Sequence, residues 1–246
     1  MEPILIYGVP AGSSMGLVAA LEWLGQPYRL SRVDMLGEMR EPSYARVNAR
    51  HETPVLITDE GRCLTETMAI AAWLEARDSD RRISYPLGTA AADRMHQMAA
   101  FINTSFTGAF GPLWAALEMQ PPEPATQTAL RQFGRDAVIK HHDQLEAMLT
   151  PGDRYVAGDR PSLADALLIG VARWLEVLQV AERTRWPRLN ALRSRLKDDA
   201  AVRFALAVEN GETADGNGAF QGHVPLEDVI TQFGAASGVN PSASKP

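Results

Sequence analysis

The segment from His51 to Trp73, HETPVLITDEGRCLTETMAIAAW, most limits what this chain can fold into. Its β-forming residues Val55 to Thr58 and Arg62 to Leu64 flank a turn signal, Asp-Glu-Gly, which is typical of a hairpin between two short strands. An apolar helical pattern follows, and Thr65 is the expected N-cap because its hydroxyl can accept a bond from a first-turn N–H. The segment therefore predicts a strand, a hairpin turn, a second strand and a helix.

The expected helix start carries groups that suit an amino-acid head group. The unpaired N–H groups and positive dipole end of a helix favour a carboxylate, and Glu66 can pair with an ammonium beside it. Pro54 has no N–H to donate and is a candidate for a cis peptide bond, which leaves the preceding backbone free to pair with an extended peptide. The alternative is that Glu66 only complements the helix dipole and Thr67 only meets solvent.

Two motifs in this segment resemble the glutathione site of the cytosolic glutathione S-transferases. In that family a V-P-x-L segment with a cis-proline precedes x-E-S-x-A-I at a helix start; the matches here are Thr53-Pro54-Val55-Leu56 and Thr65-Glu66-Thr67-Met68-Ala69-Ile70. The resemblance extends from about residue 4 to about residue 209. It implies that the Thr53 main chain pairs with the cysteinyl part of glutathione and that Glu66 and Thr67 hold its γ-glutamyl head. The glutathione-binding residues that it implies are His51, Glu52, Thr53, Pro54, Glu66 and Thr67.

The pattern along the chain predicts an α/β domain followed by an all-α domain. Strands are expected over Ile4 to Tyr7 and Tyr28 to Asp34, with a helix between them that ends at Gly25. This order fits a thioredoxin-like N-terminal domain, and the helical pattern beyond it fits the helical-bundle C-terminal domain of the resembled family. The expected divisions are a glutathione-binding domain over 1–77, a linker over 78–88, an all-α domain over 89–209 and a partly disordered extension over 210–246.

Three features of the second half refine this expectation. A stripe from Met95 to Leu113 predicts a core helix that Gly108, Gly111 and Pro112 loosen. Further helices are expected over residues 125–149 and 163–180, the latter opened by a Ser162–Asp165 capping box of structural role. In the extension, residues 224–233 suit a short helix and residues 237–246 suit disorder.

Composition limits the function classes. The 246 residues carry a net charge of −6 with no basic tract, which argues against nucleic-acid binding. No apolar run is long enough to span a membrane, and the N-terminus lacks the features of a signal peptide. Cys63 is the one cysteine, so it cannot form an internal disulfide and is expected to be a small buried residue. A cytoplasmic protein without nucleic-acid or membrane partners is expected.

Three hydroxyl groups are candidates for stabilising a glutathione thiolate. Ser13 and Ser14 precede the first expected helix, and Tyr7 ends the first expected strand. By the resemblance, Ser13 falls where the bacterial beta class carries its cysteine, counting back from Gly25, and Tyr7 falls where the tyrosine classes carry their tyrosine. We favour Ser13, which combines that position with a helix start. The alternative is that the serines only cap the helix and Tyr7 only packs.

The chain departs from the beta class at several positions. The class places a histidine and a lysine where Thr107 and Gly108 stand here, and its cysteine is absent. Glu52 stands where the family usually has lysine or glutamine near the glycine carboxylate of glutathione. Two like charges about 4 Å apart cost about 4 kcal/mol near a protein surface. Either Glu52 turns away, or a cation among Arg40, Arg50 and His51 compensates, or the ligand differs from ordinary glutathione.

The leading functional prediction is conjugation of glutathione, as a co-substrate, to a small apolar electrophile by a homodimer. The residues 89–117 are expected to contribute to the dimer contact. One alternative is glutathione-dependent thiol–disulfide or peroxide reduction; another is a non-catalytic binding protein on the same fold, as in the stringent starvation proteins. The acceptor pocket is expected to be lined by Phe106, Thr107, Phe110 and Trp114.

Two other readings of the sequence are weak. Gly12-Ser13-Ser14-Met15-Gly16 matches the nucleophile elbow of α/β-hydrolases and lies between an expected strand and a helix. It begins only a dozen residues into the sequence, however, which leaves no further upstream strand and loop to supply an oxyanion hole. The neighbouring His141 and His142 would point about 100° apart on a helix and cannot share a metal. His96 and His223 are isolated in the sequence, so no metal site is expected.

Overall fold

The computed structural model describes residues 1–234, and its N-terminal half is built on a five-stranded sheet of order β4-β3-β1-β2-β5. β1 (Ile4–Val9) lies at the centre, parallel to β2 (Tyr28–Asp34) and antiparallel to β3 (Val55–Ile57). β4 (Cys63–Thr65) completes the predicted hairpin with β3, and β5 (Phe220–His223) pairs in parallel with β2. The strand and hairpin predictions are therefore confirmed, and β5 is an addition.

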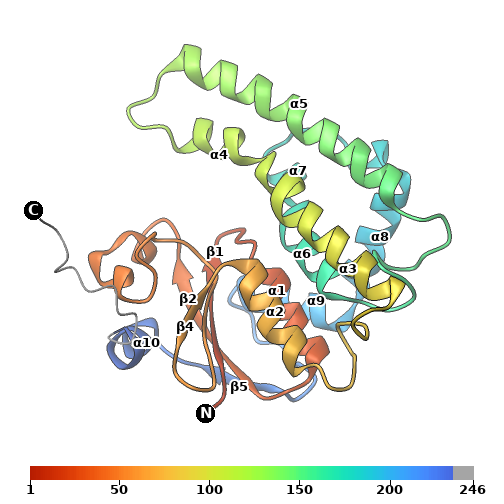
Figure 1. Cartoon of the computed structure of the whole chain (residues 1–246). Coiled ribbons are helices and arrows are strands. Elements are labelled where there is room, and N and C mark those ends of the chain that lie inside the picture. The colour runs from red at the N-terminus through yellow and green to blue at the C-terminus, as the bar shows by residue number, and fades with distance from the viewer. Residues whose placement is uncertain (235–246) are drawn as a thin grey trace, which may run out of the picture.

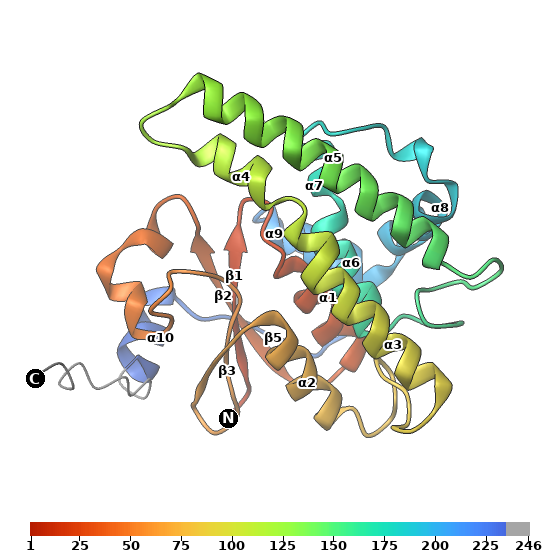
Figure 2. The same cartoon turned by 45° about the horizontal axis from the view of Figure 1, so that its top comes forward.

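The two faces of the sheet are covered by different elements (Figures 1 and 2). α1 (Met15–Leu24) and α2 (Thr67–Arg77) pack on the face that carries Leu5, Tyr7 and Val9. α1 ends at Gly25, whose φ of +72° is the left-handed conformation predicted for its C-cap. The opposite face is covered by α10 (Leu226–Phe233) and by two short 3₁₀ helices, η1 (Glu38–Arg40) and η2 (Pro42–Arg46).

The second half is helical, as predicted. The expected long helix is divided in the structure into α3 (Ala90–Phe101), a π-helical turn η3 (Ile102–Phe106) and α4 (Gly111–Glu118). The break before α4 lies where the glycines were expected to loosen the helix. α5 (Pro124–Met148) follows, and the stretch expected to run from 163 to 180 divides into α6 (Leu163–Ala172) and α7 (Trp174–Val177). The chain continues through η4 (Arg183–Arg185), α8 (Pro187–Asp198) and α9 (Ala200–Glu209).

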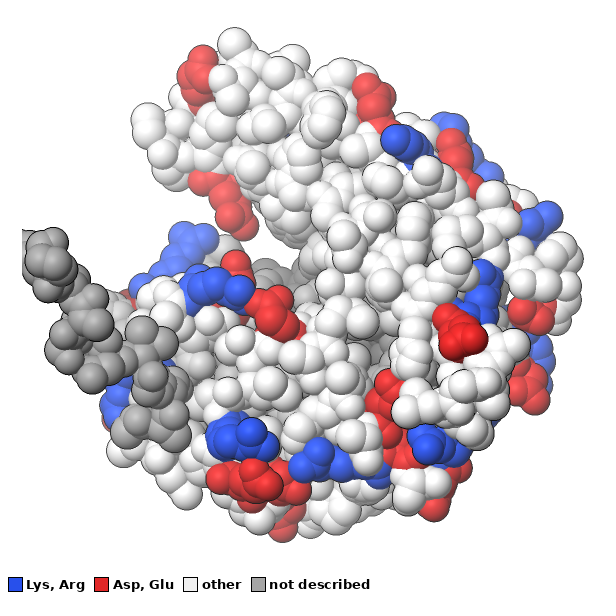
Figure 3. All heavy atoms as spheres, in the orientation of Figure 1, with Lys and Arg blue, Asp and Glu red and all other residues white. Residues whose placement is uncertain are grey.

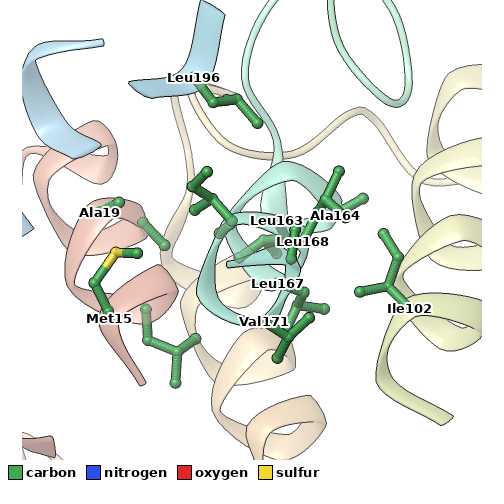
Figure 4. Close-up of a cluster of buried hydrophobic side chains, with 14 of the residues drawn as sticks. Met15, Ala19, Ile102, Leu163, Ala164, Leu167, Leu168, Val171 and Leu196 are labelled. Atoms are coloured by element: carbon green, nitrogen blue, oxygen red, sulfur yellow. The ribbon is translucent and has the colours of Figure 1, made fainter. Parts of the chain in front are cut away.

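α6 is the central helix of this half and carries the predicted capping box. Every residue of α6 is buried, and Figure 4 shows its leucines between Met15 and Ala19 of α1 on one side and Ile102 on the other. α1 and α6 approach so closely that a Cβ on Gly16 would lie 1.9 Å from the carbonyl oxygen of Ala166. This contact joins the two halves and fixes the start of α1.

The segment after α9 returns to the sheet, and the structure describes it as far as residue 234. The buried Glu22 carboxylate accepts hydrogen bonds from the Tyr28 hydroxyl at 2.6 Å and from the Asn217 N–H at 2.7 Å, which anchors the chain just before β5. The predicted short helix is confirmed as α10. The disorder predicted for residues 237–246 concerns a segment outside the described residues.

One expectation about a helix start is wrong. Glu66, with φ +73°, occupies the N-cap position of α2 in place of Thr65, which belongs to β4. Ser14 does occupy the N-cap position of α1, although its hydroxyl makes no cap hydrogen bond. Within residues 1–234, no helix is both long and apolar enough to cross a membrane.

Candidate active site

The sheet topology brings three predicted segments to one end. Because β1 and β3 are antiparallel, with Ile6 opposite Val55, the end of β1 lies beside the residues that precede β3. The pairing of Val55 with Thr65 brings the start of α2 to the same end. A Cβ on Gly8 would lie 2.6 Å from Thr53 Oγ1, so the main chain at Gly8 lies against the Thr53 side chain. The loop before α1, the Thr53–Pro54 bond and the first turn of α2 therefore meet.

The Thr53–Pro54 peptide bond is cis, as predicted, and the carbonyl before it is held from two sides. The Glu52 carbonyl oxygen accepts hydrogen bonds from the Tyr44 hydroxyl at 3.0 Å and from Asn48 Nδ2 at 2.8 Å. Tyr44 and Asn48 are both buried. These two residues position the strand start, and the sequence reasoning missed them because their role depends on a loop conformation that no local pattern encodes.

The predicted binding residues around this bond differ in exposure. His51 has φ +55°, and its Nδ1 lies 2.8 Å from the Met39 carbonyl oxygen, so the ring donates an Nδ1 proton there. Thr53 is half-buried with its hydroxyl 3.6 Å from the Met35 sulfur, and Pro54 is buried. Thr67 is half-buried as the first residue of α2. The main chain at Thr53 and the first turn of α2 thus offer the polar groups here.

Arg50 is the cation that compensates the unusual Glu52. Its Nη2 lies 2.9 Å from a carboxylate oxygen of Glu52 and also contacts a carboxylate oxygen of Glu66. The hydrogen bond that Arg50 donates to Glu66 and the negative charge of Glu52 raise the pKa of Arg50 above its usual value. Of the options left open by the sequence, compensation by Arg50 is the one the structure contains.

The three candidate hydroxyl groups have different surroundings. Ser13 is half-buried, and its hydroxyl makes no hydrogen bond with any residue of the described part of the chain. Ser14 is 1% exposed, and its Oγ accepts a 2.9 Å hydrogen bond from the Gly8 N–H inside the protein. Ser13 is therefore the available serine at the start of α1.

Tyr7 lies in the interior of β1 and is 1% exposed. Its hydroxyl is 3.2 Å from Nε2 of His223 and 3.4 Å from the carbonyl oxygen of Val208. Burial raises the pKa of Tyr7 to about 12, so the phenol is protonated at neutral pH. Its partners come from α9 and β5, which the sequence analysis did not connect with the N-terminal strand.

Two of the four residues expected to line an acceptor pocket are core residues. Phe106 and Phe110 are 0% exposed, and their rings pack edge to face at 5.9 Å, so neither faces an open pocket. Thr107 and Trp114 are half-buried; the Thr107 hydroxyl donates to the Ile102 carbonyl, and Trp114 packs against Trp174. The expectation of an apolar pocket therefore fails for the two phenylalanines.

Figure 3 shows a broad hollow between the projecting α4–α5 hairpin and the sheet-containing half of the molecule. Lys, Arg, Asp and Glu side chains gather on its sheet-side wall. Among residues 1–234, no three side chains of His, Cys, Asp or Glu converge in a way that would hold a metal ion. The site thus consists of main-chain groups, a helix start, paired charges and the hydroxyl of Ser13.

Comparison with known proteins gives consistent matches across both halves. Sequence models of the glutathione S-transferase N-terminal and C-terminal domains match residues 14–77 and 112–198. Glutathione S-transferase GstA of Escherichia coli O157:H7 is 24% identical over 209 residues, covering 83% of this chain and 98% of the relative.

Two solved structures extend the likeness to three dimensions. The glutathione transferase of Methylococcus capsulatus strain Bath is 30% identical, with a TM-score of 0.73, over 85% of this chain and 98% of its own. A sphingomonad glutathione S-transferase solved in complex with glutathione is 25% identical, with a TM-score of 0.72, over 84% of this chain and 98% of its own.

Proposed function

Since this chain belongs to the glutathione S-transferase family, we propose that it binds glutathione and conjugates it to a small electrophile. The observation that carries the proposal is the meeting of three features at one end of the sheet: the main chain at Thr53, the carboxylate of Glu66 and the first turn of α2. The main chain at Thr53 can pair with an extended tripeptide. The carboxylate of Glu66 suits the ammonium of an amino-acid head group, and the first turn of α2 suits its carboxylate.

Arg50 makes this site compatible with ordinary glutathione. The proposed ligand brings an ammonium to Glu66. The Glu66 carboxylate then pairs partly with this ammonium in place of Arg50. Arg50 stays beside Glu52 and offsets the repulsion between that carboxylate and the glycine end of the tripeptide. All three side chains are more than half exposed, so this exchange requires no buried charge to lose its partner.

The proposed role of Ser13 is to stabilise the thiolate of bound glutathione. A model thiol has a pKa of about 8.5, and one pKa unit corresponds to about 1.4 kcal/mol. A hydrogen bond from a hydroxyl to a charged group contributes about 1.5–3 kcal/mol, and a helix N-terminus about 0.3–1 kcal/mol. Together they lower the thiol pKa by about one to three units, which is enough to populate the thiolate at neutral pH.

The acceptor is proposed to enter the hollow beneath the α4–α5 hairpin (Figure 3). Trp114 and Thr107 are the partly exposed members of the predicted acceptor set, and they support an apolar electrophile rather than a charged one. We further infer that the chain acts as a homodimer in the cytoplasm, where its single cysteine, Cys63, stays reduced.

One observation favours a non-catalytic glutathione-binding protein as the second candidate. Tyr7 and Ser14 both use their hydroxyl groups inside the protein, so Ser13 alone is left to act on the thiol. If Ser13 does not reach the sulfur, the site binds the tripeptide without activating it.

The ultraviolet absorbance of the thiolate of bound glutathione, followed against pH, tests the proposed role of Ser13. In the wild type the thiol is expected to titrate below the free thiol, and Ser13→Ala is expected to raise its pKa by about one to two units while glutathione still binds. Tyr7→Phe is the control and should leave the thiol pKa in place. A bound thiol that titrates like free glutathione in the wild type would favour the non-catalytic candidate.

A further inference from the structure

The η1–η2 segment, residues 35–52, leads to the tripeptide side of the candidate site and has few anchors of its own. It connects β2 to β3 and ends next to Thr53. η1 has no buried residue, and η2 has only Tyr44. The other buried side chains of the segment are those of Val47 and Asn48, which are 2% and 6% exposed. The position of the segment therefore depends on what packs against Tyr44 and Val47.

α10 is the helix that packs there. Tyr44 and Val47 share one buried apolar cluster with the sheet face and with three residues of α10: Val229, Ile230 and Phe233. Figures 1 and 2 both show α10 beside the η1–η2 segment. A Cβ on Gly234 would lie 2.7 Å from the Cβ of Arg46, so the chain at the end of α10 lies against η2. The sheet and α10 together hold the two buried side chains of the segment.

A short path of contacts leads from this cluster to the tripeptide site. The Tyr44 hydroxyl donates to the Glu52 carbonyl oxygen at 3.0 Å, and Asn48 Nδ2 donates to the same oxygen at 2.8 Å. A shift of Tyr44 in the cluster moves this carbonyl group, and with it the main chain of Thr53 that is proposed to pair with the ligand. None of the residues of α10 belongs to the candidate site, so its influence passes through the η1–η2 segment.

The thiol side of the site is anchored separately. The loop that carries Ser13 is held by the helical half: Trp174 Nε1 donates to the Ala11 carbonyl oxygen at 2.7 Å, and the Arg173 guanidinium donates to the Gly12 carbonyl oxygen at 2.8 Å. α1 and this loop lie on the face of the sheet opposite to α10. Loss of the α10 contacts is therefore expected to disturb the tripeptide side without moving Ser13.

We propose that α10 positions the glutathione site and that Phe233 is its main positioning residue. Phe233 is the largest side chain that α10 buries in the cluster, and its ring would lie 3.5 Å from a Cβ on Gly61. Its carbonyl oxygen lies 3.8 Å from Cys63 Sγ, so it also contacts the β3–β4 hairpin that leads to Glu66. The inference rests on the proposed function and adds that glutathione affinity and thiol activation have separate structural supports.

Calorimetric titration of full-length variants with glutathione tests the role of Phe233. Phe233→Ala is expected to bind about three- to tenfold more weakly, because the apparent affinity falls with the fraction of chains whose η1–η2 segment is in the binding conformation. Phe233→Leu keeps an apolar side chain in the cluster and should bind within about twofold of the wild type. Leu196→Ala removes a fully buried side chain of α8 from the other core cluster; it is the control for lost stability and should bind like the wild type.

Three further measurements separate positioning from a general loss of stability. At saturating glutathione, the thiol pKa in Phe233→Ala should equal that of the wild type, since Ser13 is anchored elsewhere. Without ligand, the amides of residues 38–52 should exchange hydrogen faster in Phe233→Ala but not in Leu196→Ala. Val229→Ala removes less from the same cluster and should weaken glutathione binding by about two- to threefold, so the test does not depend on one variant.

Several results would overturn the inference: an unchanged glutathione affinity in Phe233→Ala and Val229→Ala, an equal loss of affinity in Leu196→Ala, or a shifted thiol pKa in Phe233→Ala. A wild type that does not bind glutathione would instead contradict the proposed function. The exchange comparison then decides the role of α10, since it needs no ligand. Unchanged exchange of residues 38–52 in Phe233→Ala would show that α10 does not hold the segment.

Discussion

Ser13 and Ser14 are neighbours with the same side chain, yet the surroundings of their hydroxyl groups assign them different tasks. Ser14 Oγ is the acceptor for the buried Gly8 N–H, and Ser13 makes no hydrogen bond through its side chain among residues 1–234. One is part of the folded framework at the end of β1, and the other is free to meet a ligand.

This difference predicts that two alanine substitutions have unequal effects on stability. Ser14→Ala removes the acceptor of the Gly8 N–H in the interior and is expected to lower the free energy of unfolding by about 1–3 kcal/mol. Ser13→Ala removes no hydrogen bond and is expected to change it by less than about 0.5 kcal/mol. Urea unfolding measures both; an equal loss in the two variants would contradict the distinction.

His142 is expected to make the fold sensitive to acid. It is 0% exposed, its Nδ1 lies 2.8 Å from the Val138 carbonyl oxygen, and its Nε2 has no partner in the described part of the chain. Burial lowers the pKa of His142 from 6.5 to about 4. Between these two values the unfolded chain binds a proton that the folded chain does not, so stability falls as the pH falls through this window.

The size of that effect follows from the shift. A lowering of about 2.5 pKa units corresponds to about 3 kcal/mol of stability, lost progressively between about pH 6.5 and pH 4. His142→Phe, which keeps an aromatic ring between Phe106 and Trp186, should lose this contribution. Thermal melting across the window checks it: an identical pH dependence in the variant would mean that other groups govern acid lability.

At the scale of elements, the added strand β5 and helix α10 form a second covering layer for the sheet. α10 buries Val229, Ile230 and Phe233 against the face that carries Ile4 and Ile6. The Glu22–Asn217 hydrogen bonds hold the approach to β5. These contacts attach residues 217–233 to the sheet and to α1.

Truncation at two points tests the importance of this layer. A chain ending after Asn210 exposes the apolar face under α10 and leaves β2 as an unpaired edge, so its melting temperature should fall by several degrees or more, with aggregation. A chain ending after Gly234 keeps every described contact and is the control. A shorter chain that melts like the control would show that β5 and α10 contribute little.

The elements with strong local signals were predictable. Gly25 marks the end of α1 because a left-handed C-cap favours glycine, and Ser162 and Asp165 mark the start of α6 because a capping box is a local hydrogen-bond pattern. The Thr53–Pro54 bond and the helix start after it carry short motifs of the family. Each of these features is encoded within a few consecutive residues.

The features that escaped prediction depend on distant contacts. β5 lies in a glycine-rich stretch and exists because β2 offers it an open edge. From the sequence alone Tyr7 is a possible hydrogen-bond donor to the thiolate, but in the fold its hydroxyl contacts His223 and Val208. The spacing of Phe106 and Phe110 fits a pocket wall and also fits a core. Only the packing of α5 and α6 around them shows that they belong to the core.

For the molecule as a whole, a homodimer is the expected assembly. Leu117 of α4 and Phe133 of α5 are 60% and 66% exposed on the projecting hairpin, which leaves large apolar side chains on one element. Burial of such residues favours association. Sedimentation at micromolar concentration should give twice the chain mass of 26.8 kDa, and Phe133→Lys should shift the equilibrium toward the monomer. A wild type that sediments only as the monomer would contradict the assembly.

Calorimetric titration with glutathione tests the account most directly, because the whole interpretation depends on a tripeptide site at Thr53 and Glu66. The wild type should bind one glutathione per chain. Glu66→Gln should weaken binding by about tenfold or more, since a lost hydrogen bond to a charged partner costs about 1.5–3 kcal/mol, and Thr67→Ala should weaken it less. Glu60→Gln, an exposed glutamate of the β3–β4 turn, is the control and should bind like the wild type. Equal affinities for wild type and Glu66→Gln, or no binding by the wild type, would contradict the account.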